Sequence, residues 1–228
     1  MTPFRIALYY APETHDPLHQ RASAWLGRDA VSEAEIPQPA IAGVDIAEIT
    51  ADARGYGFHA TLKPAFRVAR DVKAALQAAQ DFAARTTPFA LPPLQVTDLD
   101  GFLALRESAP CPALHALADD AVIALDAHRA PATEAEIVRR KPERLSPRQR
   151  EYLAAWGYPY VFAEWRFHMT LTRRLTPGEK AIILPAVTEA LGDAPAAARM
   201  VTDICIFAQA APGAPFTILE RLKLQIGR

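Results

Sequence analysis

One five-residue pattern, Phe-His-X-Thr-Leu, occurs twice in the chain, at residues 58–62 and again at residues 167–171. At ordinary residue frequencies, chance would give a second copy of its four fixed residues with a probability on the order of 1 in 1,000. Because side chains alternate across a β-strand, each copy would place its His and Thr on one face and its apolar residues on the other. We therefore expect two similar strands that lie side by side and form one site.

The two motifs together contain the groups that phosphoryl transfer needs. His59 and His168 would supply one general base and one general acid, and Thr61 and Thr170 would donate hydrogen bonds to a phosphate anion. The sequence leaves open which imidazole is the base. In the alternative interpretation, two core strands each carry a buried, hydrogen-bonded histidine, but the presence of two copies favours a shared site.

Neighbouring side chains extend this candidate site. Alternation along the strands places Lys63 on the face of His59, and it places Arg166 and Thr172 on the face of His168. The two cations could bind a phosphate that carries one or two negative charges. A solvated strand end is an equally acceptable interpretation of both cations.

Two aromatic residues and a basic segment are further substrate-binding candidates. Tyr56 and Tyr160 could stack on a base or a sugar, with core packing or turn anchoring as the alternative. Residues 139–150 are rich in arginine, and Arg139 and Arg140 could belong to a lid over the substrate. The alternative is an ordinary solvated face, because acidic residues interrupt the segment.

Composition and charge exclude several classes of protein. Half of the residues are hydrophobic and the net charge is −1, so no long-range field attracts the chain to nucleic acid or to an anionic membrane. Cys111 and Cys205 have no metal-binding spacing and no disulfide framework, which is typical of a reducing cytoplasm. His15 and His19 are four residues apart but lack acidic or cysteine partners, so we expect no metal site. We also expect no membrane span and no secretion signal.

The order of predicted elements indicates an α+β chain with two halves, each centred on one motif. We expect strands at residues 5–10, 89–96, 102–106, 201–209 and 216–226, besides the two motif strands. Helices are predicted at residues 17–26, 72–82, 112–128 and 177–191, with two short capped helices between 133 and 150. Residues 33–53 are predicted as mostly loop with a short helix. No glycine-rich phosphate loop supports a parallel nucleotide-binding sheet.

The two His-X-Thr motifs resemble those of the 2H phosphoesterase superfamily, which includes 2′,3′-cyclic nucleotide phosphodiesterases and bacterial RNA 2′,5′ ligases. More closely, the chain resembles a branch of unknown function encoded near carbon-phosphorus lyase genes, in residues 56–63, 158–161 and 166–171. The resemblance covers nearly the whole chain. It implies one domain, residues 1–228, made of two intertwined, pseudo-symmetric antiparallel-sheet lobes around a central cleft.

The resemblance also implies site residues and chemistry. His59 and His168 would be the catalytic pair, Thr61 and Thr170 the phosphate ligands, and the reaction would need neither a metal ion nor a cofactor. The expected substrate is a small phosphorylated compound, in particular a ribose-linked cyclic phosphate in phosphonate metabolism.

Two other functions stay open from the sequence. An RNA-end 2′,3′-cyclic phosphodiesterase or 2′,5′ ligase would be expected to show a continuous basic track, which the near-neutral charge disfavours. A non-catalytic module that binds a phosphorylated ligand would not require two titrating groups. The leaving group, the direction of the reaction and the oligomeric state are not determined by the sequence.

Overall fold

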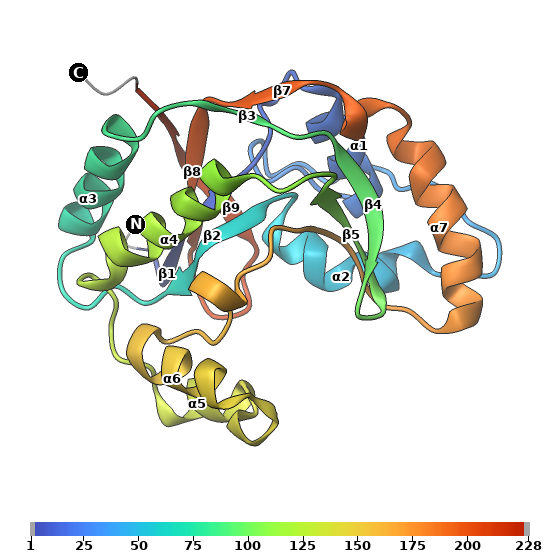
Figure 1. Ribbon diagram of the computed structural model, residues 1–228. Coiled ribbons are helices and arrows are strands. Elements are labelled where there is room, and N and C mark those ends of the chain that lie inside the picture. Colours follow the sequence, from blue (N-terminus) through green and yellow to red (C-terminus); the bar gives the residue numbers. More distant parts are fainter. Residues whose placement is uncertain (1–2, 226–228) are drawn as a thin grey trace.

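The computed structural model describes residues 3–225, and an antiparallel sheet of seven strands forms its centre (Figure 1). The strand order in this sheet is β4-β5-β6-β2-β1-β8-β9, and β3 pairs with β7 in a separate two-stranded sheet. The mixture of helices with antiparallel strands confirms the predicted α+β class. The strands are β1 (Arg5–Tyr10), β2 (Ala60–Phe66), β3 (Phe89–Leu91), β4 (Leu94–Leu99), β5 (Phe102–Glu107), β6 (Met169–Arg174), β7 (Arg199–Val201), β8 (Asp203–Gln209) and β9 (Phe216–Lys223).

The large sheet divides into two lobes where β2 meets β6. These two strands share one paired position, Ala60 opposite Met169, at the start of each strand. Beyond it they run in opposite directions, β2 along β1 and β6 along β5. We call β2-β1-β8-β9 the His59 lobe and β4-β5-β6 the His168 lobe. The His59 lobe combines strands from both ends of the chain, so the lobes are not simply the two halves of the sequence.

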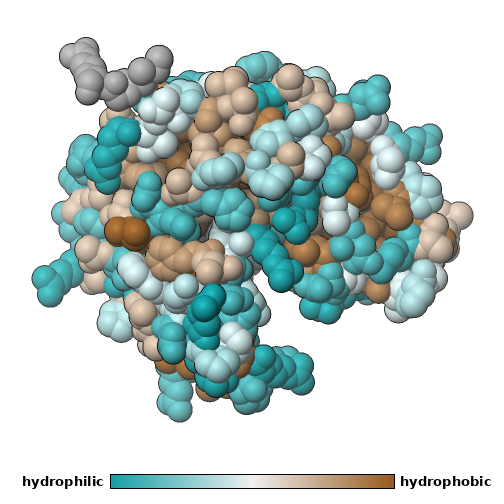
Figure 2. Space-filling view, in the orientation of Figure 1, coloured by the Kyte–Doolittle hydropathy of each residue, from teal (hydrophilic) through white to brown (hydrophobic). Residues whose placement is uncertain are grey.

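The helices cover the sheet unevenly. Helices α3 and α4 pack on the His59 lobe, whereas α1 and α2 pack against β6 of the His168 lobe and α7 packs on α1. In Figure 1, α5 and α6 project from this body, and Figure 2 shows the surface hollowed between the projection and the body. The α-helices are α1 (Pro17–Leu26), α2 (Ile46–Tyr56), α3 (Val72–Ala84), α4 (Pro112–Asp126), α5 (Glu134–Arg139), α6 (Pro147–Trp156) and α7 (Pro177–Leu191). Short 3₁₀ turns follow at Pro142–Arg144, Phe162–Glu164 and Ala194–Ala196.

Side-chain caps begin most of these helices, as the sequence predicts. Oxygens of aspartates accept hydrogen bonds from the first free backbone N–H groups of α1 and α3. Reciprocal capping boxes open α5, α6 and α7. The capping residues are Asp16, Asp71, Thr133, Ser146 and Thr176.

Three predicted elements differ in extent from the structure, and one of them, the strand expected at 201–209, is divided between the end of β7 and β8. The short helix expected within residues 33–53 is the 11-residue helix α2, which is longer than predicted and continues to Tyr56; Asp45 caps it, and it buries Ile49 and Ala53. The expected strand 89–96 is two strands, because adjacent prolines at 92 and 93 interrupt it. The last strand ends at Lys223, and residue 226 of its predicted range lies outside the described residues.

Two hydrophobic clusters occupy opposite faces of the His59 lobe. The larger one lies under the helices and includes Leu8, whereas the smaller one contains Ala7, Tyr9, Phe207 and Phe216. This assignment follows the alternation of side chains along β1. Of the helices built from residues 3–225, none has the length and apolar character needed to cross a membrane.

Candidate active site

The two motifs come together at the junction of the lobes. Continuing the register of the Ala60–Met169 pair by one residue on each side places His59 across from Thr170 and Thr61 across from His168. The polar side chains of both motifs therefore occupy one region, although more than 100 residues separate them along the chain. The apolar partners of the motif pack into the core on the other face, as the alternation predicts.

Both imidazoles are held in the same way. Nδ1 of His59 lies 2.8 Å from the carbonyl oxygen of Gly57, and Nδ1 of His168 lies 2.8 Å from that of Arg166. A carbonyl oxygen can only accept a hydrogen bond, so in each ring Nδ1 carries the proton and donates. Nε2 is then the titrating nitrogen in both rings, and Oγ1 of Thr61 lies 3.5 Å from Nε2 of His59.

The backbone before His59 requires a glycine. Gly57 has a φ of +76°, and a Cβ there would come within 2.4 Å of Cβ of Ala30. Only glycine adopts this conformation without strain and fits this space. The carbonyl that orients His59 is therefore positioned by a residue that cannot be replaced without a local shift.

His59 lies among aromatic rings. Its ring stacks on Tyr9 at a centroid distance of 4.0 Å, and Tyr56 and Phe207 lie at 5.8 and 5.7 Å. Burial lowers the pKa of His59 to about 4; the hydrogen bond to Gly57 acts in the opposite direction and His168 adds to the lowering. At neutral pH, His59 is therefore uncharged with Nε2 free to accept a proton.

His168 has a more polar environment. The edge of its ring meets Phe102 at 5.9 Å. Burial lowers its pKa, the hydrogen bond to the Arg166 carbonyl raises it, and the charges of Arg106 and Glu107 act in opposite directions. Unlike His59, His168 thus has a carboxylate near enough to favour its protonated form.

Sequence reasoning missed Arg106 and Glu107. In the β5–β6 ladder Leu105 pairs with Met169, so the same register places Arg106 across from His168. The two side chains form an ion pair at 3.4 Å, while Nε of Arg106 and Oε2 of Glu107 are buried without a hydrogen-bond partner in residues 3–225. The missing signal is the strand pairing, because nothing local in the sequence shows that β5 lies beside the second motif.

Lys63 does not lie where alternation along the strand predicts, so the expected position of its side chain is wrong. The β1–β2 pairing changes register between Tyr9 and Leu8, so β2 contains an extra residue just before Lys63. Lys63 is only 2% exposed, and its Nζ donates to Oδ1 of Asp126 at 2.8 Å and to the carbonyl of Val122 at 3.2 Å. Its ammonium thus binds α4 instead of facing the cleft.

Thr172 and Arg166 also differ from expectation. Thr172 is buried, and its Oγ1 accepts a hydrogen bond from N of Leu103, where the β5–β6 ladder is irregular. Arg166 precedes β6, and its exposed guanidinium lies 3.8 Å from Asp100. Arg166 lies three residues before the start of β6, so the register of the strand, which the site description continues by one residue to His168, does not fix the direction of its side chain.

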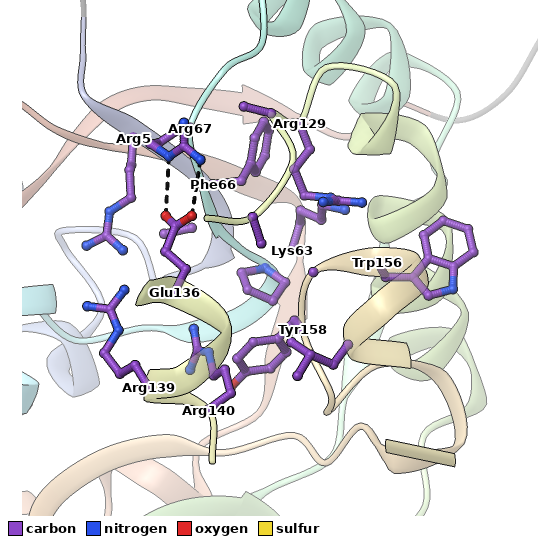
Figure 3. Close-up of a pocket in the computed structure, with 16 residues that line it drawn as sticks. Arg5, Lys63, Phe66, Arg67, Arg129, Glu136, Arg139, Arg140, Trp156 and Tyr158 are labelled. Carbon is purple, nitrogen blue, oxygen red and sulfur yellow. Dashed lines mark hydrogen bonds and ion pairs between the residues drawn. The ribbon is translucent and has the colours of Figure 1, made fainter. Parts of the chain in front are cut away.

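Of the remaining candidates, only the two arginines lie at the pocket between β2 and the α5–α6 projection, which Figure 3 shows. Arg139 and Arg140 both line it, and the guanidinium of Arg140 lies 4.6 Å from the ring centroid of Tyr158. Tyr160 is exposed and meets Tyr158 edge to face at 5.6 Å. Tyr56 stacks on Phe216 at 5.0 Å as well as lying near His59.

The described part of the chain contains no cluster of side chains suited to bind a metal ion. Within residues 3–225 no group of three or more His, Cys, Asp or Glu side chains could hold a metal ion. His19 instead contacts Asp29, its Nε2 lying 3.2 Å from Oδ1. Cys111 and Cys205 are both buried free thiols.

Comparison with known proteins places the chain in a family. A family model described as "Protein of unknown function (DUF1045)" matches residues 61–217. A curated relative, ribose 1,5-bisphosphate phosphokinase PhnN of Janthinobacterium sp. (strain Marseille), is 37% identical over 227 residues, which cover 96% of this chain and 50% of the relative. The chain spans about half the length of the curated relatives that it matches.

Two solved structures are similar over 99% of this chain and 100% of their own. They are the apo form of E. coli LigT, with a TM-score of 0.49 and 15% identity, and a phosphoesterase, with a TM-score of 0.48 and 13% identity. The family match covers more than half of the chain and includes His168 and both motif threonines. The chain therefore belongs to the DUF1045 family.

Proposed function

We propose that this protein is a phosphoesterase that opens a cyclic phosphate on a small ribose compound with two histidines and without a metal ion. The observation that carries the proposal is the paired arrangement of His59 and His168. Each ring has its tautomer set by a backbone carbonyl two residues earlier, and the two motif strands meet at one paired position. Two imidazoles with free Nε2 atoms at one junction are suited to a base and an acid that act on the same phosphorus.

The surroundings of the two rings suggest their roles. His59, kept neutral by burial at the aromatic cluster, is the general base. His168, with Glu107 nearby, is the general acid, and a bound phosphate anion favours its protonated form further. These assignments follow from differences in environment, since the hydrogen bonds that orient the two rings are alike.

In the proposed reaction His59 gains one proton and His168 loses one, so protons balance when both rings return to their starting states. Nε2 of His59 takes a proton from water as the water oxygen attacks phosphorus, and the bond from phosphorus to one ribose oxygen breaks. Nε2 of His168 gives its proton to that leaving oxygen. Exchange with solvent then returns the proton from His59 to His168. The hydroxyls of Thr61 and Thr170 would donate to the non-bridging oxygens.

The ribose part of the proposal has separate support. The curated relatives are named for a phosphokinase that acts on ribose 1,5-bisphosphate. This chain has no glycine-rich phosphate loop of the kind that holds ATP in many kinases, so we assign it no kinase step. We infer a related sugar phosphate as substrate, in phosphonate metabolism and in the cytoplasm, where free thiols such as Cys111 and Cys205 persist.

A turnover assay with a chelator tests this function. A 2′,3′-cyclic nucleotide and a ribose cyclic phosphate are each incubated with the protein in excess EDTA, and ³¹P NMR follows conversion to the monoester. We expect faster turnover of the ribose compound, unchanged by EDTA or by added divalent metal ions. Loss of turnover in EDTA would contradict the metal-free mechanism. Binding of both compounds without conversion would contradict catalysis and indicate a binding module.

A further inference from the structure

The pocket beside the α5–α6 projection has an excess of positive charge. It has a volume of about 50 Å³, enough for more than one water molecule and thus for a group the size of phosphate. One carboxylate, Glu136, lines it. The cations that line it are Arg5, Lys63, Arg67, Arg129, Arg139 and Arg140 (Figure 3).

Three of these cations are paired with carboxylates. Nζ of Lys63 and Nε of Arg129 both lie 2.8 Å from Oδ1 of Asp126. Arg67 donates to both carboxylate oxygens of Glu136, at 3.3 and 3.1 Å. These pairs hold the α5–α6 projection and α4 against the end of β2, and they leave no carboxylate of the pocket lining for the other three arginines.

Arg5, Arg139 and Arg140 form no ion pair with any residue of the described range 3–225. Arg5 donates from Nε to Gln209 at 2.8 Å, and Arg140 lies over Tyr158. In Figure 3 the guanidinium groups of Arg5 and Arg139 point toward one another. Like charges that face each other repel, so this arrangement is favourable when an anion lies between them.

This pocket adjoins the histidine site along the His59 lobe. Arg5 and Tyr9 are four residues apart on β1, on the same face, and a strand of that length spans about 13 Å. The guanidinium of Arg5 lies 5.4 Å from the ring of Phe216, which stacks on Tyr56, and Tyr56 lies beside His59. The long side chain of Arg5 shortens the distance between the arginine pocket and the histidine site, so one small molecule is able to contact both.

The effects of nearby charges on the pKa of Tyr9 are consistent with a short distance between the arginine pocket and the histidine site. Burial raises the pKa of Tyr9, and the charges of Arg5 and Arg140 act in the opposite direction. Both guanidinium groups are thus close enough to influence the residue on which His59 stacks.

We propose that Arg5, Arg139 and Arg140 bind a second phosphate group of the substrate, separate from the phosphate that reacts between His59 and His168. This inference rests on the proposed function and narrows its substrate class to ribose cyclic phosphates that also carry a phosphate monoester. Guanidinium groups suit this role because they bind phosphate oxygens in a bidentate manner and keep their charge.

A pair of substrates tests the inference directly. Turnover is compared for a ribose cyclic phosphate with and without a 5-phosphate, in the wild type, Arg139→Ala and a matched control, Arg148→Ala. Arg148 is exposed on the same projection and does not line the pocket. We expect Arg139→Ala to lower kcat/KM for the 5-phosphorylated substrate about 10- to 100-fold, mainly through KM, because a charged hydrogen bond is lost. Turnover of the other substrate stays the same, and Arg148→Ala changes neither.

An equal loss on both substrates, or no loss on either, would overturn the inference. A second measurement separates it from the proposed function. Calorimetric titration with ribose 5-phosphate, which has no cyclic phosphate to open, is compared in the wild type, Arg139→Ala and Arg148→Ala. If neither cyclic phosphate is turned over but Arg139→Ala weakens this binding, the proposed function fails and the second phosphate site stands. Equal binding in all three proteins would reject the site.

Discussion

The two lobes carry the same motif in different surroundings. In both, Nδ1 of the histidine donates to the carbonyl two residues before it at 2.8 Å. In the His59 lobe the ring stacks on Tyr9 within an aromatic cluster, whereas His168 lies beside an arginine and a carboxylate on β5. Local sequence thus determines how each ring is oriented, and neighbouring strands determine how readily each ring is protonated.

The residue four positions after each histidine extends this comparison. Lys63 and Thr172 occupy equivalent places in the two motifs, and both are buried and bonded away from the site. Lys63 binds Asp126 on α4, and Thr172 accepts from Leu103 where β5 and β6 are irregularly paired. In both lobes the residues of the candidate site therefore end at the threonine of the motif, and the side chain two positions later supports the fold.

Removing either imidazole should have the largest effect. We expect His59→Ala and His168→Ala each to lower kcat by about 10²- to 10⁴-fold, because each removes one proton-transfer group. The double variant should lose little more than either single variant, since the two groups act as a unit. Steady-state kinetics measure this, with cooperative unfolding curves to show an intact fold. Full activity in one variant would break the equivalence of the lobes and remove that histidine from the mechanism.

The next effect concerns stability in the His59 lobe. Asp126→Asn would leave the ammonium of Lys63 buried without a charged partner, which should lower the free energy of unfolding by about 3 kcal/mol. Urea titration measures this loss. Asp120→Asn, at an exposed position of the same helix, is the control and should change stability by less than about 0.5 kcal/mol. A stable Asp126→Asn variant with altered kcat would instead show that Lys63 serves the site.

The smallest effect is a shift in pH dependence that distinguishes the two rings. In the wild type, kcat/KM should decrease as the pH is lowered to about 4, because the base His59 becomes protonated there. It should also decrease as the pH is raised and His168 loses its proton, because the pKa of His168 lies below its usual 6.5. Glu107→Gln removes the carboxylate that favours protonated His168, so the alkaline limb should move to lower pH. The acid limb should stay in place. Movement of the acid limb alone would reverse the proposed roles.

Part of the geometry of the candidate site follows from local backbone structure. Each histidine directly precedes a strand, and alternation continued by that one residue places His59 with Thr61 and His168 with Thr170. Repetition of the motif indicates that the two strands meet. Lys63 and Arg166 could not be placed in this way. An extra residue in β2 and a non-strand segment before β6 interrupt the alternation, and neither feature is visible in the local pattern.

The sequence by itself determined the repeated motif, the helix caps and the α+β class, since these depend on contacts among residues close along the chain. Only the tertiary structure decided that Arg106 lies across from His168 and that Arg5 shares a pocket with Arg139 and Arg140. The physical reason is that strand register and the packing of the α5–α6 projection depend on segments far apart in sequence. Their relative positions follow from how the whole chain buries its apolar surface.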